Sequence, residues 1–212
     1  ENGKVGKEEE LMENSKKICM SCFRPMGEFE VCPHCGWVEQ RVPKESYHLY
    51  PGTVLQDRYL IGAVLDFGGF GIAYKAWDMR LSKIVAIKEY YPAGLVNRIP
   101  GEKEVLMFSG EKSDQFRYGI DRFLAEARNM AKFSDYPYIV NVYDFFEENH
   151  TAYIVMEYLD GVALNKYLKQ QGGRLNHLGR GAAQGHPLIL PPPVQLGQAG
   201  GGKALHQAVQ FL

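Results

Sequence analysis

Short apolar runs separated by turn signals begin at residue 59, and this pattern predicts a dense series of β-strands. The runs are rich in β-branched and aromatic residues, which favour strands. Only short gaps separate the first three runs, so antiparallel hairpins are expected. The five predicted strands are Tyr59–Leu65, Gly71–Trp77, Ile84–Tyr90, Ile139–Phe146 and Thr151–Tyr158.

Between the third and fourth strands the apolar period changes from that of a strand to that of a helix. Apolar residues recur there at spacings of three and four, which places them on one helix face. They are Phe116, Ile120, Phe123, Leu124, Ala127, Met130 and Ala131. Ser113 or Asp114 is the expected N-cap, after an irregular connection over residues 91–112. A further short helix is expected around Leu164–Leu168. Three strands, one helix and two strands predict an α+β fold with a five-stranded antiparallel sheet.

The segments outside this central region have a different composition. Residues 1–15 are expected to be a disordered leader, and residues 41–57, which are polar and carry two prolines, a linker. Residues 172–212 contain nine Gly and four Pro, so a low-complexity tail is expected there. The chain has 25 Asp and Glu residues, and none follows Asp160. The tail is therefore a segment unlike the region before it.

Overall composition is that of a globular protein and gives no reason to expect nucleic acid or an anionic membrane surface as a partner. Of the 212 residues, 45% are hydrophobic and 23% charged, with a net charge of −1. This near-neutral balance gives no electrostatic reason to expect nucleic acid as a partner. No apolar run reaches the length of a membrane span, and the charged start does not resemble a secretory signal peptide. A cytoplasmic protein without a membrane segment is expected.

Two close cysteine pairs mark a separate module over residues 16–40. The cysteines are Cys19, Cys22, Cys32 and Cys35. Each C-x2-C turn presents two thiolates to one metal, and two facing turns supply the four sulfurs of a tetrahedral zinc site. The spacing resembles a small zinc ribbon. Four sulfurs leave no open coordination position, so the zinc is expected to be structural; an iron–sulfur or redox dithiol site and free thiols are the alternatives. Gly36 is expected in the left-handed region, and His34 is not needed as a ligand.

A glycine cluster over residues 65–76 lies between the first two predicted strands, and Val85-Ala-Ile-Lys88 lies in the third. Glycines let backbone amides approach phosphates because no side chain blocks them. A lysine in an apolar strand needs a partner, since an unpaired buried charge is costly. Glu126 on the predicted helix is the candidate partner.

This combination resembles the protein kinase family, and the resemblance covers residues 58–171, from the first predicted strand to the hinge. Tyr136-Pro-Tyr-Ile-Val140 resembles the family's entry to its fourth strand, and Tyr153-Ile-Val-Met-Glu-Tyr-Leu-Asp-Gly161 its fifth strand and hinge. Within that family, this region resembles a bacterial relative of the eukaryotic Ser/Thr kinases. The resemblance implies a kinase small lobe behind an N-terminal zinc ribbon, with ATP, Mg²⁺ and a protein substrate as partners.

Roles for individual residues follow from the resemblance. Lys88 would bind the α- and β-phosphates and pair with Glu126. Met156 would be the gatekeeper, the Glu157 carbonyl and the Leu159 backbone would bond adenine, and Ala73 and Ala86 would cover its face. The implied ATP-binding set is completed by the hairpin residues Leu65, Phe67, Gly68, Gly69, Phe70 and Gly71.

The chain departs from the family pattern in two ways. Asp66 replaces the first glycine of the loop, and its carboxylate would repel phosphates. Nothing in residues 172–212 resembles the H-R-D or D-F-G motifs, which carry the catalytic base and a magnesium ligand. The expectation is a kinase that is truncated before its catalytic loop, with a frame change near residues 173–176, so that this fragment alone is inactive. The alternatives are a non-catalytic nucleotide-binding pseudokinase and a zinc-ribbon scaffold or interaction module.

Overall fold

The structure is a computed structural model that describes residues 17–39, 43–69, 71–133, 136 and 139–161. Its elements are β1 (Val54–Leu55), β2 (Tyr59–Gly68), β3 (Gly71–Asp78), β4 (Lys83–Tyr90), β5 (Val96–Asn97), β6 (Leu106–Met107), α2 (Glu111–Ala131), β7 (Val142–Glu148) and β8 (Thr151–Glu157). The leader, the helix expected around Leu164–Leu168 and the tail lie outside the described residues.

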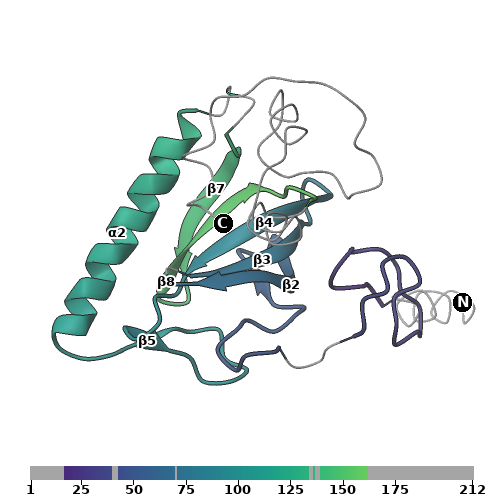
Figure 1. Ribbon diagram of the computed structural model, residues 1–212, viewed down its shortest axis with the longest axis horizontal. Helices are drawn as coiled ribbons and strands as arrows, with labels where there is room; N and C mark the ends of the chain where they lie inside the picture. Colours follow the sequence, from purple (N-terminus) through teal and green to yellow (C-terminus); the bar gives the residue numbers. More distant parts are fainter. Residues whose placement is uncertain (1–16, 40–42, 70, 134–135, 137–138, 162–212) are drawn as a thin grey trace, which may run out of the picture.

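A curled antiparallel sheet forms the centre of the fold, with strand order β1-β2-β3-β4-β8-β7. Its five long strands confirm the predicted α+β class, and Figure 1 shows α2 lying along one face of this sheet. The sheet has six strands rather than five, because the two-residue β1 pairs with the start of β2. Two residues are too few to give a periodic signal in the sequence.

Helix α2 confirms the predicted apolar stripe but begins earlier than expected. Phe116, Phe123, Leu124 and Ala127 are its buried residues. The N-cap is Gly110, without a side-chain capping bond, so the prediction of Ser113 or Asp114 was wrong. Acidic Glu111 and Asp114 lie in the first turn instead, where their negative charges interact favourably with the positive end of the helix dipole.

The face of the sheet opposite α2 is also covered, which the sequence did not indicate. Leu49 and Leu55 are buried in the core, although residues 41–57 were expected to form only a linker. From residue 43 onward this segment packs on the sheet instead. The Leu49 amide donates to the Tyr74 hydroxyl at 3.0 Å, which ties the segment to β3.

The connection over residues 91–112 covers the same face through one buried ion pair. Arg98 bonds Glu89 of β4, and both side chains are fully buried. Glu89 also accepts bonds from the hydroxyls of Tyr74 (2.9 Å) and Tyr153 (2.8 Å). The connection expected to be irregular therefore carries a specific anchor, and it adds the small β5–β6 pair.

The sheet curls until its two ends meet. The Tyr59 ring of β2 stacks on Phe146 of β7 with centroids 5.9 Å apart, and the Tyr59 hydroxyl donates to Asp144 at 3.0 Å. Arg58 lies 3.5 Å from the same carboxylate. The remaining core consists of apolar side chains between the sheet and its two coverings. In the described part of the chain, no helix has the length and apolar character to cross a membrane.

Candidate functional site

One face of the central strands carries the side chains expected around a nucleotide. Lys88 of β4 lies opposite Ala73 of β3 and Ile154 of β8, and Ala86 lies opposite Met156 of β8. Residues two apart on a strand share a face, so Lys88 and Ala86 point the same way. Lys88, Ala73, Ala86 and Met156 are thus brought together on the face that α2 covers in part.

The electrostatic state of Lys88 is set by burial and by one carboxylate. Burial lowers its pKa because the charged ammonium loses hydration, while the charge of Glu126 raises it by a smaller amount. Within the described residues, the ion pairs join other side chains, and none links Lys88 to Glu126. The expected Lys88–Glu126 ion pair is thus not formed within 4.0 Å here, although the charge of Glu126 favours the charged form of Lys88.

The glycines of the β2–β3 turn fall into two kinds. A Cβ at Gly71 would lie 2.0 Å from the Glu89 carbonyl oxygen, so packing of the protein itself requires glycine there. A Cβ at Gly68 or Gly69 would meet no described atom within 4 Å, and neither residue has a left-handed φ. The fold of the described residues thus has no need of glycine at these two exposed positions.

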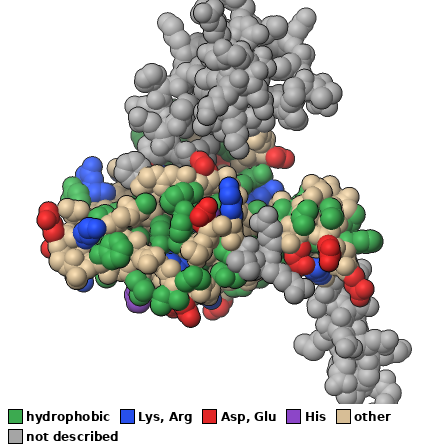
Figure 2. Space-filling model, turned by 60° about the horizontal axis from the view of Figure 1, so that its bottom comes forward, with side chains coloured by type: hydrophobic (Ala, Val, Ile, Leu, Met, Phe, Trp, Pro, Cys, Tyr) green, Lys and Arg blue, Asp and Glu red, His purple; other side chains and the backbone are tan. Residues whose placement is uncertain are grey.

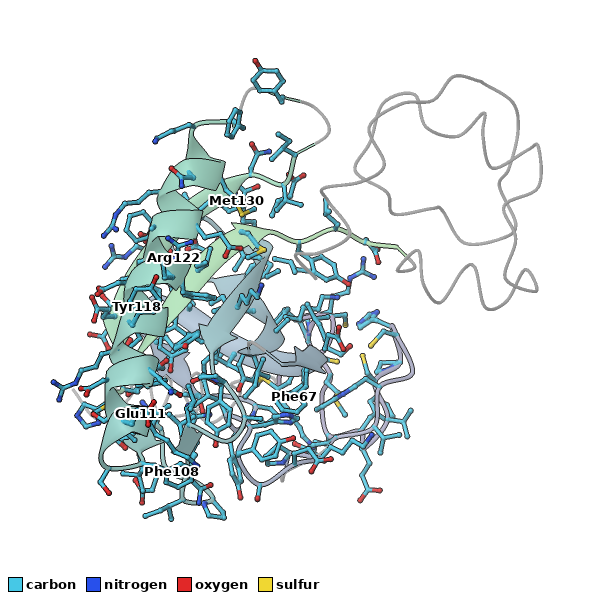
Figure 3. All side chains as sticks on the ribbon, turned by 60° about the vertical axis from the view of Figure 1, so that its left-hand side comes forward. Phe67, Phe108, Glu111, Tyr118, Arg122 and Met130 are labelled. Carbon is cyan, nitrogen blue, oxygen red and sulfur yellow. The ribbon has the colours of Figure 1, made fainter. Side chains whose placement is uncertain are left out.

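Phe67 lies on the opposite face from Lys88. It pairs with Ile72, which lies opposite Glu89. Its ring contacts Tyr47 at a centroid distance of 5.1 Å and His48 at 6.0 Å. Figure 3 shows Phe67 well away from the labelled residues of α2. The Phe67 side chain therefore points away from Lys88, and the expected role of Phe67 in nucleotide binding stays a prediction that its backbone would have to fulfil.

The remaining residues of the expected nucleotide site are placed as follows. Leu65 is exposed on β2 just before the loop. Glu157 ends β8, and its carboxylate accepts a bond from the Asn141 side chain at 2.9 Å. Leu159 follows in the described hinge segment and is half-buried. Phe70 lies outside the described residues.

Asp66, the residue in place of the first loop glycine, has a local partner. Its carboxylate accepts a bond from the Phe67 amide at 2.9 Å. Asp66 pairs with Ala73, so it shares the face of Lys88. A negative charge is thereby fixed on the face where phosphates are expected.

The four cysteines form a second candidate site, in the N-terminal module. Their Sγ atoms all lie within 4.8 Å of one another, and the pairs Cys19–Cys35 and Cys22–Cys32 are 3.7 Å apart. A tetrahedron of sulfurs about 2.3 Å from a zinc ion has edges of about 3.8 Å. The cluster therefore has the dimensions to hold one zinc ion.

Backbone amides and a left-handed glycine shape the two turns that carry this cluster. The amides of Ser21 and His34 each donate to a cysteine sulfur at 3.4 Å, and Gly36 has φ 72°, which confirms its predicted left-handed conformation. His34 is exposed and takes no part in the cluster. The buried cluster of the described part of the module is Cys19, Met26 and Cys32, with half-buried Cys22 and Trp37 packed against it, a core too small to hold the module together without a bound metal.

The cysteine thiols differ in acidity in the absence of a metal ion. Burial raises the pKa of Cys19 to about 12. Burial also opposes ionisation of Cys32, but backbone amides of His34 and Cys35 and the neighbouring thiols lower its pKa to about 6. Zinc is bound by thiolates, so metal binding would release the proton of Cys19.

Comparisons with known proteins agree on the region around the first site. The family model described as "Protein kinase domain" matches residues 59–180, a range that continues past the expected limit at residue 171. Serine/threonine-protein kinase PrkC of Bacillus subtilis is 34% identical over 121 residues, covering 57% of this chain and 16% of its own length. Serine/threonine-protein kinase PknB of Mycobacterium tuberculosis is 36% identical over 122 residues, covering 56% of this chain and 16% of its own length.

A solved structure has the same fold over this region. It is titled "PpkA-294 apo form", with 34% sequence identity and a TM-score of 0.56. The similarity covers 59% of this chain and 44% of that chain. The chain thus spans less than half of each of these three proteins.

Proposed function

Because this chain belongs to the protein kinase domain family, we propose that residues 58–171 are the ATP-binding small lobe of a serine/threonine protein kinase. The complete kinase would transfer the γ-phosphate of ATP to hydroxyl groups of a protein substrate. The residues that bind Mg²⁺ and accept the hydroxyl proton would come from outside these 212 residues. No Asp or Glu follows Asp160 in the sequence, so residues 161–212 contain no carboxylate side chain for either role.

The open glycines Gly68 and Gly69 carry the proposal. Glycine is kept where the backbone needs a left-handed φ, where a neighbour leaves no room, or where a ligand must approach closely. The first two reasons do not apply within the described residues. Close approach of a ligand is then the reason left for glycine at these two positions. Phosphate oxygens that accept bonds from backbone amides would be such a ligand.

Lys88 supplies the charge for the same ligand. Its pKa is lowered by burial, so a phosphate next to it would recover the electrostatic energy that desolvation removes. Ala73 and Ala86 on the same face have small side chains that leave room for a flat ring. The gatekeeper role of Met156 and the adenine contacts of Glu157 and Leu159 are part of the proposal.

The cysteine cluster is proposed to hold a structural zinc ion. Four thiolates at tetrahedral spacing match the preference of zinc, and they leave no coordination position for a substrate. Zinc would supply the folding free energy that the small core of the module lacks.

Calorimetric titration of the 212-residue chain with ATP and Mg²⁺ tests the nucleotide site. Gly68→Ala should weaken binding by about tenfold or more, which corresponds to about 1.4 kcal/mol. It should leave the free energy of unfolding within about 1 kcal/mol of wild type, because the added Cβ meets no described atom. Gly71→Ala should instead destabilise the fold by about 1–3 kcal/mol, since its Cβ meets backbone.

Lys88→Met should abolish measurable binding, and Lys83→Met on the same strand is its matched control. Lys83 lies opposite Asp78, at the end of β4 remote from the glycine turn, so its loss should not change the affinity. Equal affinity of wild type, Gly68→Ala and Lys88→Met would overturn the proposed ATP site. Stoichiometric zinc in wild type, lost in Cys19→Ser, would support the metal centre, and metal-free folded protein would refute it.

A further inference from the structure

Within the described residues, the cysteine module contacts the sheet through Met20, in the first C-x2-C turn, and through Phe23, which directly follows this turn. The carbonyl oxygen of Met20 accepts a hydrogen bond from the Ala63 amide of β2 at 2.8 Å. Met20 lies between Cys19 and Cys22. The position of this acceptor therefore depends on the geometry of the first knuckle.

An aromatic stack extends the same contact. Phe23, the residue after Cys22, is buried although it belongs to neither hydrophobic core. Its ring lies 6.0 Å from the Trp77 ring of β3 in a stacked arrangement. Phe23 has φ 57°, a left-handed conformation that costs energy in a non-glycine residue. The Cys19 carbonyl accepts its amide at 2.8 Å, so the formed knuckle is what holds the ring in place.

The sheet side of the contact is shaped to receive the module. A Cβ at Gly62 would lie 2.1 Å from the Met20 oxygen and 2.7 Å from the Phe23 ring. Any side chain there would push the module away. Gly62 and Ala63 lie where the β2–β3 register shifts between Ile61 and Val64, and this irregularity leaves the Ala63 amide for a partner outside the sheet.

We infer that the first cysteine knuckle is a metal-dependent docking element, which holds the module on β2 at the strand segment that leads into the glycine turn. The inference rests on the proposed zinc site. The bound metal fixes the knuckle, the knuckle presents the Met20 carbonyl and the Phe23 ring, and Gly62 provides the space for both. Loss of the metal removes the two contacts together and exposes the Ala63 amide.

The opposite side of the module does not take part in this docking. Phe29 is 65% exposed, and in Figure 2 the module, on the right, shows hydrophobic and acidic side chains on its outer surface. Phe29 is a phenylalanine of the same module outside the contact with the sheet. It therefore provides a matched control for Phe23.

Hydrogen exchange of the Ala63 amide, followed by NMR on the ¹⁵N-labelled full chain, tests the inference. Exchange should be slow in the zinc-loaded protein and at least about tenfold faster after zinc is removed with a chelator, because the amide then loses its acceptor. Gly62→Ala and Phe23→Ala should accelerate it similarly with zinc still bound, whereas Phe29→Ala should leave it unchanged.

Zinc content, measured on each sample by mass spectrometry, separates the two proposals. Wild type without stoichiometric zinc would refute the metal centre itself. Zinc-loaded wild type whose Ala63 exchange equals that of the chelated form would overturn the docking inference and leave the metal centre intact. Because a Cβ at Gly62 would also lie 3.1 Å from the Lys75 carbonyl oxygen, Gly62→Ala can disturb the sheet. Phe23→Ala is then decisive, and unchanged Ala63 exchange in that variant refutes docking.

Discussion

Replacement of Arg98 by Met should be among the most destabilising single changes in the lobe. Arg98 and Glu89 are both fully buried. Besides Glu89, the guanidinium donates to the Tyr47 carbonyl at 2.7 Å and the Lys103 carbonyl at 3.2 Å. Methionine fills a similar volume but makes none of these bonds, so the Glu89 carboxylate remains buried without its cationic partner.

The expected loss is about 3–5 kcal/mol, the usual cost of removing one partner from a buried ion pair. The hydroxyls of Tyr74 and Tyr153 still donate to Glu89, which argues for the lower part of that range. A double variant, Glu89→Gln with Arg98→Met, should recover part of the loss because no uncompensated charge is left buried. Lys103→Ala in the same connection should cost less than about 0.5 kcal/mol, since this side chain is exposed.

Urea unfolding of the full chain, followed by far-UV circular dichroism with saturating zinc, measures these free energies. A loss below about 1 kcal/mol for Arg98→Met would refute the reasoning, since such a value is typical of exposed pairs. A double variant that is no more stable than Arg98→Met would show that the buried charge is not the source of the loss.

Three further results are expected. Lys88→Met should stabilise the nucleotide-free lobe at pH 7, because the pKa of Lys88 is lowered in the fold from its usual 10.5. The unfolded chain then binds more protons than the folded chain, so the free energy of unfolding of wild type rises relative to that of the variant as pH approaches 10.5. Urea unfolding measures both values, and a difference between them that does not change with pH would contradict this. Asp66→Gly should tighten ATP binding by about two- to fivefold in calorimetry by removing a charge near the phosphates, and weaker binding would contradict it. In a Trp77→Phe background, chelation of zinc should abolish the urea unfolding transition of Trp37 fluorescence while the strand signal of the lobe in circular dichroism persists, and an unchanged Trp37 transition would contradict this.

The parts of the fold that follow a clear period were predictable. The five long strands and the buried stripe of α2 appear where apolar spacing placed them. The register of β3 and β4 then brings Lys88, Ala73 and Ala86 to one face, as the motif spacing indicated. The cysteine pairs were equally informative, because two short turns around one metal depend little on the remaining chain.

The parts that were missed depend on contacts between distant residues. Arg98 and Glu89 are charged, so sequence patterns place them at the surface, and only their pairing allows burial. Leu49 is one apolar residue in a polar segment, too isolated to indicate a layer that covers the sheet. The face on which the Phe67 side chain lies was not predictable, because register shifts in β2 change which residues share a face, and such shifts leave no mark in composition.

The closed curl of the sheet has a consequence for how copies of this protein meet in solution. Open sheet ends offer rows of unpaired backbone groups on which a strand of another molecule can add, and natural proteins block them with charged residues or short edge strands. Here β1 has two residues, and Gln56 and Arg58 on one end bond Glu148 and Asp144 on the other. Within the described residues, the short β1 and these bonds across the two ends oppose the addition of a strand from another molecule.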